Sequence, residues 1–243
     1  MPGLKMALVT TLSAIALIAT TSPRLNAFCF QPQPIRVCAE FFKADEVFTG
    51  TVIANNYQPN GIPEPTEPQP GWHYRLKVQD AYRGTLGPVV DIYTEDTSGR
   101  FPLDSGQSYL LFAYKTGSIA QIFGCANSTK LADAGPKVAE INRIVKAAGS
   151  DLDGEIWGRI VQWLGGAGVA GVQVTARGNE SVYRTRTIDD GSFHLRVPPG
   201  QYSIIAQSPH WNFSKWDVSF DDPSHLRIEP GGCAQVQLGA LAK

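Results

Sequence analysis

The sequence predicts a mainly β protein made of two small β domains, and three observations support this. Its 243 residues exceed one typical domain, and a hydrophobic fraction of 43% is enough for two cores. Gly, Pro, Thr and Val are frequent, which favours short strands and turns. Strand-like stretches bounded by Gly, Pro, Asn or Asp recur along most of the chain, whereas only residues 134–148 show convincing helical periodicity.

The first 27 residues predict a secretory signal peptide. Met1 to Lys5 carries positive charge, and residues 6–19 form an apolar run that is shorter than the ~20 residues of a membrane span. Leu25-Asn26-Ala27 offers a cleavage site that ends in a small residue. We therefore expect an exported protein that is secreted, periplasmic or at the cell surface, and that does not span the membrane once processed.

Four cysteines follow the predicted cleavage site: Cys29, Cys38, Cys125 and Cys233. An even number in an exported protein favours disulfides, and four cysteines allow three pairings. A pair of Cys29 with Cys125 would tie the start of the first domain to its end, and Cys38 with Cys233 would then cross between domains. The sequence has no CxxC pair and no His at ligand spacing from a Cys, so no metal site is predicted.

The first domain is predicted at residues 28–148. Residues 37–44 favour one or two helical turns, and residues 57–71 predict an extended loop because they contain five prolines. A helix is predicted at 134–148, where Val138, Ile141, Ile144 and Val145 recur at helical spacing. Strands are expected at 46–53, 73–82, 89–95, 109–114 and 118–123. Five strands and a closing helix predict an OB-like five-stranded barrel with a C-terminal helix.

Residues 149–153 are short, polar and acidic, which predicts a linker, and residues 154–243 form the second predicted domain. Asp189-Asp190-Gly191 predicts a hairpin turn between two strands, because Gly accepts the positive φ of such turns. Strands are expected at 155–162, 171–176, 181–187, 192–197, 200–207 and 234–238. This pattern predicts a small antiparallel β-sandwich without helices.

The first domain resembles netrin-like domains related to the tissue inhibitors of metalloproteinases. The resemblance rests on VCAEFFKADEVFTGTV at 37–52, on YRLKVQDAYRG and SYLLFAY, and on Cys125 followed by a helix. It implies an OB-like barrel. In those inhibitors an N-terminal cysteine chelates the protease zinc through its amine and carbonyl, and Cys29 is the residue that matches. Cleavage after Ala27 would leave Phe28 in front of Cys29, which departs from that pattern.

The second domain resembles carboxypeptidase regulatory-like domains, which have a transthyretin-like sandwich. The residues are GEIWGRIV, GAGVAGVQVTARG and TRTIDDGSFHLRVPPGQYSIIAQSP, in matching order and spacing. This resemblance implies a non-catalytic module.

No catalytic site and no cofactor are predicted. The histidines lie outside any HExxH motif, and Asp189 with Asp190 suits a turn better than acid–base chemistry. Asp217, Asp221 and Asp222 lack the spacing of an EF-hand loop, which favours a solvated acidic loop. A net charge of −1 without a basic cluster argues against nucleic acid as a partner.

Trp211, Phe213 and Trp216 form a dense aromatic stretch that can stack on sugar rings or on a protein partner, or can cover the sandwich core. We therefore expect a non-enzymatic binding or scaffolding protein whose partner is an extracellular or cell-surface protein or glycan. The alternatives are a carbohydrate-binding module acting through Trp211 and Trp216, and a metalloproteinase inhibitor acting through the N-terminal edge of the first domain.

Overall fold

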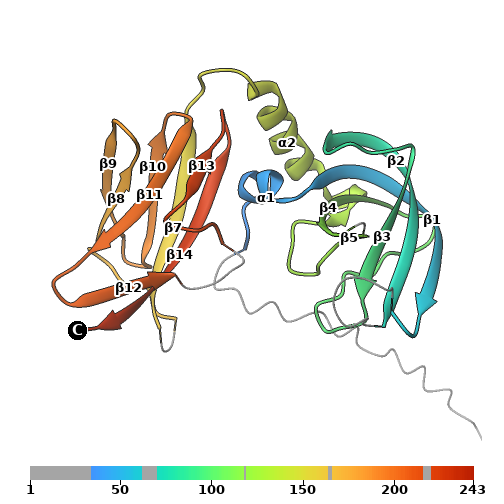
Figure 1. The fold of residues 1–243 in the computed structure, drawn as a ribbon, viewed down its shortest axis with the longest axis horizontal. Coiled ribbons are helices and arrows are strands. Elements are labelled where there is room, and N and C mark those ends of the chain that lie inside the picture. Colours follow the sequence, from blue (N-terminus) through green and yellow to red (C-terminus); the bar gives the residue numbers. More distant parts are fainter. Residues whose placement is uncertain (1–33, 62–69, 118, 164–165, 216–219) are drawn as a thin grey trace, which may run out of the picture.

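The structure, a computed structural model, describes residues 34–61, 70–117, 119–163, 166–215 and 220–243. The predicted signal peptide, Cys29 and Trp216 lie outside these residues. The mainly β fold expected from the sequence is confirmed. Within the described residues the strand pairings fall into two groups, residues 46–130 and residues 154–242, and Figure 1 shows two short helices lying between them.

The first group forms a sheet that closes on itself. Its strands are β1 (Glu46–Gln58), β2 (Gly71–Arg83), β3 (Val89–Glu95), β4 (Ser108–Thr116), β5 (Ile119–Gln121) and β6 (Thr129–Lys130). The pairing order is β1-β2-β3-β5-β4-β6, and an additional β1–β4 pairing completes a ring. β3 and β5 pair in parallel and the other pairs are antiparallel. This ring is the arrangement of a small barrel, whose interior holds a cluster that includes Phe48, Leu76 and Leu111.

Two helices and a 3₁₀ turn lie against the outside of this ring. They are α1 (Val37–Lys43), η1 (Leu131–Asp133) and α2 (Gly135–Ala147). Pro136 lies in the first turn of α2, where its missing N–H costs nothing. A second cluster joins α1, α2 and the barrel, and it contains Phe41, Phe112, Ile141 and Ile144 as well as Cys233 from the far end of the chain. The helices therefore form the layer between the two groups of strands (Figure 1).

The second group is a sandwich of two sheets. Its strands are β7 (Gly154–Gln162), β8 (Gln173–Arg177), β9 (Val182–Arg186), β10 (Ser192–Val197), β11 (Gly200–Gln207), β12 (Trp211–Lys215), β13 (Leu226–Ile228) and β14 (Cys233–Ala242). One sheet has the order β10-β7-β14-β12 and the other β13-β11-β8-β9. Alternate residues such as Ile156, Val174, Ile204 and Val236 fill the core between them.

Two details of the predicted sandwich are wrong. β14 pairs with β7 in parallel, so the sandwich is not purely antiparallel. The turn at Asp189-Asp190-Gly191 does not form a hairpin, because β9 belongs to one sheet and β10 to the other. The turn itself is present: Gly191 has φ of +80° and its N–H bonds the carbonyl of Ile188 at 2.8 Å. It carries the chain from one sheet across to the other.

The first domain also differs from prediction at one loop. The expected excursion at 57–71 is shorter, because β1 continues to Gln58 and β2 begins at Gly71; residues 62–69 lie outside the described part of the chain.

The three short strands β6, β12 and β13 were not predicted. Among the described residues, no helix is long and apolar enough to cross a membrane.

Candidate functional site

An open cleft lies at one end of the sandwich, where β11 turns into β12. Its volume is about 580 Å³. Trp211 and Phe213 both line the cleft, and both also pack against the sandwich core. The two roles considered for these residues, stacking on a ligand and covering the core, are therefore compatible. The other lining residues are Gly171, Gln173, Arg186, Ala206, Gln207, Ser208, Pro209, Asn212 and Lys243.

The cleft combines aromatic rings with hydrogen-bonding amides and two cations, and none of the described residues that line it is acidic. The Arg186 guanidinium donates to the carbonyl of Gly171 at 2.9 Å, and the Lys243 ammonium donates to the carbonyl of Ser208 at 2.9 Å. Each cation has further N–H donors beyond that bond. Gln173, Gln207 and Asn212 carry amides that both donate and accept. This combination suits a polyhydroxylated ligand, whose apolar ring faces stack on aromatic rings while its hydroxyls bond to amides.

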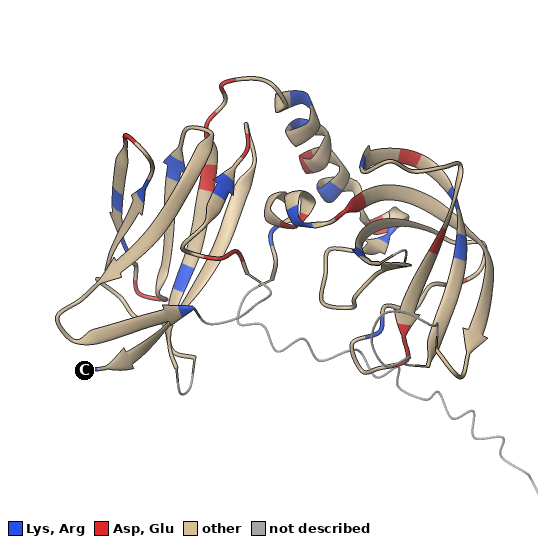
Figure 2. Ribbon diagram, viewed as in Figure 1, with Lys and Arg blue, Asp and Glu red and all other residues tan. Residues whose placement is uncertain are grey.

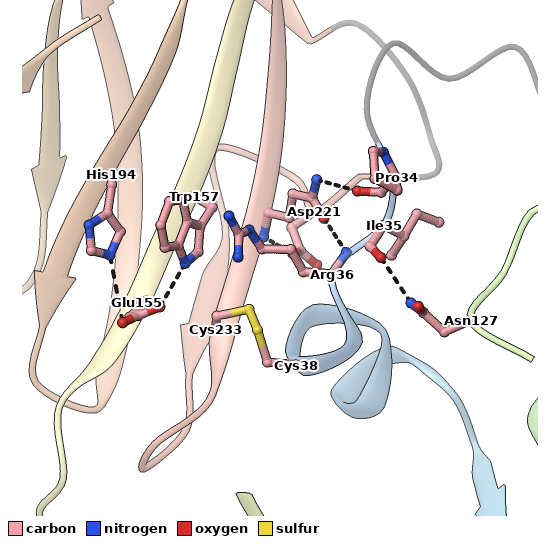
Figure 3. The surroundings of a disulfide bond; sticks show 11 residues. Pro34, Ile35, Arg36, Cys38, Asn127, Glu155, Trp157, His194, Asp221 and Cys233 are labelled. Carbon is pink, nitrogen blue, oxygen red and sulfur yellow. Dashed lines mark hydrogen bonds and ion pairs between the residues drawn. A yellow bond between two sulfur atoms is a disulfide. The ribbon is translucent and has the colours of Figure 1, made fainter. Parts of the chain in front are cut away.

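A disulfide joins the two domains. Cys38 in α1 pairs with Cys233 at the start of β14, which confirms the predicted crossing (Figure 3). Cys125 is also disulfide-bonded, while its expected partner Cys29 lies outside the described residues. A bond between positions 195 residues apart restricts the unfolded chain strongly and fixes α1 against the sandwich.

The face of the sandwich next to this disulfide is covered by the segment before α1. In the register of the sheet, Trp157 lies beside His194 on one side and Gln235 on the other. The Gln235 amide accepts a bond from the N–H of Arg36 at 2.7 Å and donates to the carbonyl of Pro34 at 3.1 Å. These bonds replace water on two backbone groups of the segment, and they explain why β14 is buried on both faces.

Arg36 and His194 flank the Trp157 ring, as Figure 3 shows. The Arg36 guanidinium carbon lies 3.5 Å from the ring centroid, and the His194 ring stacks with centroids 3.9 Å apart. Glu155 accepts the Trp157 indole N–H at 2.7 Å and lies 3.8 Å from His194. Burial lowers the pKa of Arg36, and Glu155 and Glu140 oppose this change. His194 is exposed on the outer face of β10, where its ring stacks on Trp157.

A buried carboxyl group holds α1 to the barrel. Glu40 is fully buried and accepts bonds from the Tyr114 hydroxyl at 2.9 Å and from the backbone and side-chain N–H groups of Asn127 at 2.7 and 2.6 Å. Asn127 also donates to the carbonyl of Ile35 at 2.9 Å. Burial raises the pKa of Glu40, while the bonds from Asn127 and Tyr114 oppose that rise. This network is structural, because its donors are all occupied with one another.

A second cleft, also of about 580 Å³, lies between the domains beside Cys233. Its charges are largely matched within the protein: Lys43 lies 3.4 Å from Asp221, and Arg227 lies 2.6 Å from Glu229. The Arg83 guanidinium donates to the carbonyls of Ala44 and Phe42 at 2.7 and 3.1 Å. Of these contacts, the Lys43–Asp221 ion pair is the one that joins the two domains.

Of the acidic residues singled out in the sequence, Asp221 and Asp222 are bonded to neighbouring groups of the second domain. Asp221 accepts the N–H of Gln235, and Asp222 accepts both the hydroxyl and the N–H of Ser224. The bonds from Ser224 lower the pKa of Asp222 to about 2. Asp217 lies outside the described residues, and across the described ranges no group of three or more His, Cys, Asp or Glu gathers to hold a metal.

The structure brings Trp211 and Phe213 together in the cleft, whereas Trp216 lies outside the described residues. Sequence reasoning missed the polar partners Arg186, Gln173 and Gln207, which lie on three different strands. The sequence did contain a signal for the strand that carries the aromatic residues. It is the alternation of Trp211-Asn212-Phe213-Ser214, a period-2 pattern that is typical of a half-buried strand.

Comparisons with known proteins bear on the second domain. No curated protein matches the chain. Among solved structures, the Bacillus anthracis TIE protein matches with a TM-score of 0.30 and 13% identity. That match covers 80% of this chain and 31% of the other, so this chain spans about a third of the length of the structure it matches. The carboxypeptidase regulatory-like domain family matches residues 155–228. Residues 155–228 are therefore a carboxypeptidase regulatory-like domain.

Proposed function

We propose that this chain is a non-enzymatic binding protein of the extracytoplasmic space, and that it binds a glycan in the cleft at Trp211 and Phe213. The observation that carries the proposal is the composition of that cleft, in which two aromatic rings lie beside three side-chain amides and two cations. Protein sites for polyhydroxylated ligands need both an apolar surface for stacking and directional hydrogen bonds, and both are present here.

A non-enzymatic role is supported by the family of the second domain, whose members form a non-catalytic β-sandwich. It is also supported by the polar groups of the described residues. Ser208 in the cleft accepts the backbone N–H of His210, and the Glu40 carboxyl is closed off by Asn127 and Tyr114. Neither arrangement gives an activated nucleophile.

The disulfides support an extracytoplasmic location, because such bonds persist in oxidising compartments. In this proposal residues 1–27 are the signal peptide, and the first domain is netrin-like. The closed order of its strands and the helices against it are compatible with that assignment. In this proposal the first domain supports the sandwich, since its segment from Pro34 to Cys38 lies against the second domain instead of being presented to a protease.

The test is calorimetric titration of the mature protein with a panel of neutral and acidic oligosaccharides. We expect at least one member to bind, and we expect Trp211→Ala to remove that binding. Phe123→Ala is the matched control, because Phe123 is an aromatic residue 45% exposed on the first domain. Because Trp211 also contacts the core, the variants Gln207→Ala and Asn212→Ala test the same cleft through exposed amides. Binding that survives all three cleft changes would contradict the proposal.

A further inference from the structure

The two outer faces of the sandwich differ. The outer face of the sheet β10-β7-β14-β12 carries Trp157 and Cys233, and around these two residues it is covered by Arg36 and α1 of the first domain. The outer face of the sheet β13-β11-β8-β9 has no such cover among the described residues, and Figure 1 shows it on the side away from the barrel. Side chains alternate between the core and the solvent along these strands, and this alternation determines which residues the open face carries.

Three arginines occupy this open face. Val174 and Ala176 of β8 point into the core and Tyr183 of β9 packs against it, so the alternate positions point outward. Those outward positions include Arg177 on β8 and Arg184 and Arg186 on β9, and all three arginines are exposed. Figure 2 shows these strands with blue segments, and with a red one at the turn that joins them.

The strand register places the arginines close together. Arg186 pairs with Gln173, Arg184 with Thr175, and Arg177 with Val182. Arg184 and Arg186 are alternate residues of one strand and are therefore roughly 7 Å apart, and Arg177 is the diagonal neighbour of Arg184 at a similar distance. The three side chains thus form a row along the two strands.

Among the described residues, this row has no acidic partner. In the described parts of the chain, Arg177 and Arg184 make neither an ion pair nor a side-chain hydrogen bond, and Arg186 bonds a backbone carbonyl. Several other exposed arginines are paired, such as Arg75 with Asp91 and Arg196 with Asp153. The nearest acidic residues in sequence, Glu180, Asp189 and Asp190, lie beyond the ends of β9.

The row is continuous with the proposed glycan cleft. Arg186 lines the cleft, and Gln173 lies between Arg186 and Gln207 in the register of three neighbouring strands. A chain seated in the cleft against Trp211 can therefore continue over Gln173 and Arg186 toward Arg184 and Arg177. Among the described residues along this path, its next units would meet positive charge and no acidic side chain.

We infer that the ligand is an acidic polysaccharide, seated in the cleft by one sugar unit and held along β9 and β8 by carboxylates on the units that follow. This inference rests on the proposed function. Guanidinium groups bind carboxylates with two parallel N–H bonds, and repeated charges on the ligand suit repeated arginines on the sheet. A neutral glycan would leave the arginine row unused.

The experiment compares three probes of matched length on the mature protein: an oligogalacturonate, a neutral oligosaccharide and single-stranded DNA. We expect the oligogalacturonate to bind most tightly and to weaken as salt is raised. The double variant Arg177→Gln and Arg184→Gln should lower its affinity by at least about tenfold, because two charge-assisted contacts are lost. Arg143→Gln on α2, an exposed arginine of the other domain, should leave affinity unchanged.

The outcomes separate the two proposals. Equal binding of the neutral and acidic oligosaccharides, both lost in Trp211→Ala, would keep the glycan cleft and overturn the acidic ligand. Loss of oligogalacturonate binding in the double arginine variant but not in Trp211→Ala would keep the acidic ligand and overturn the cleft. Equal binding of DNA would show an unselective polyanion surface and overturn the inference. Binding of none of the probes at any salt concentration would overturn both.

Discussion

The guanidinium carbon of Arg36 lies 3.5 Å from the centroid of the Trp157 ring, which connects the segment before α1 to the outer face of the sandwich. Together with the Cys38–Cys233 bond, this contact holds the two domains in one orientation. The cation and the ring attract each other, while the partial burial of Arg36 opposes the attraction.

Arg36→Gln should loosen the contact between the domains without unfolding either. We expect a loss of about 1 kcal/mol of interdomain stabilisation, because one cation–π contact is removed. Hydrogen exchange should become faster in α1 and in the part of β7 around Trp157. Arg143→Gln is the control, since Arg143 is exposed on α2. Unchanged exchange in both regions would show that the disulfide alone fixes the orientation.

Glu40 should make stability depend on pH. Burial raises its pKa above the ordinary value of 4.5, so the protonated form is favoured in the folded state. The stability of the parent relative to Glu40→Gln should therefore be greatest below pH 4.5 and should fall as pH rises through the raised pKa. Urea unfolding of both proteins between pH 4 and pH 8, in steps of about 0.5 pH units, measures this difference. A difference that grows with pH would mean that the bonds from Asn127 and Tyr114 outweigh burial.

Gly191→Ala should destabilise the second domain much more than Asp190→Asn. Gly191 has φ of +80°, and an added Cβ would lie 2.2 Å from the Ile160 carbonyl oxygen, so both conformation and space oppose it. We expect a loss of more than about 1 kcal/mol. Asp190 accepts the N–H of Ser192 at 2.9 Å, and Asn keeps that acceptor. Denaturant unfolding of the two variants in the full chain gives the comparison. Equal stabilities would refute the role of Gly191 in the turn.

Limited proteolysis should cut first between Gly149 and Gly154, where Ser150 to Asp153 are exposed between α2 and β7. The two fragments should stay together on a non-reducing gel and separate after reduction, because Cys38 and Cys233 join them. Thiol titration of the unreduced, denatured protein should detect no free cysteine. Fragments that separate without reductant would contradict the interdomain disulfide. Early cleavage between Gly171 and Gln207 would contradict the predicted domain boundary.

Local sequence patterns predicted the strands well where turns bound them clearly. Residues 192–197 and 200–207 are strands with the predicted limits, since Gly191 and Pro198-Pro199 interrupt the chain on either side. The short strand Leu226–Ile228 was missed because three residues give too little alternation to recognise. The strand Trp211–Lys215 was missed because its aromatic residues were interpreted as a ligand-stacking cluster or as cover for the core, and not as part of a strand.

Pairing between distant strands could not be predicted from local patterns. The turn at Asp189 to Gly191 is encoded locally, but whether the following strand joins the same sheet depends on packing against β7. The parallel pairing of β14 with β7 likewise joins strands at opposite ends of the domain. The cleft was only partly predicted for the same reason: Trp211 and Phe213 stood out in the sequence, whereas Arg186 and Lys243 approach them only in the folded sandwich.

The most direct test of glycan binding in the cleft is an NMR titration of the isotope-labelled mature protein with the oligosaccharide that binds most tightly in the panel. The account predicts shifts of the Trp211 indole N–H and of the side-chain amides of Gln173, Gln207 and Asn212, with the Trp157 indole N–H unchanged. Shifts confined to Trp157 and its neighbours at the interface between the domains, or no shifts at all, would contradict it.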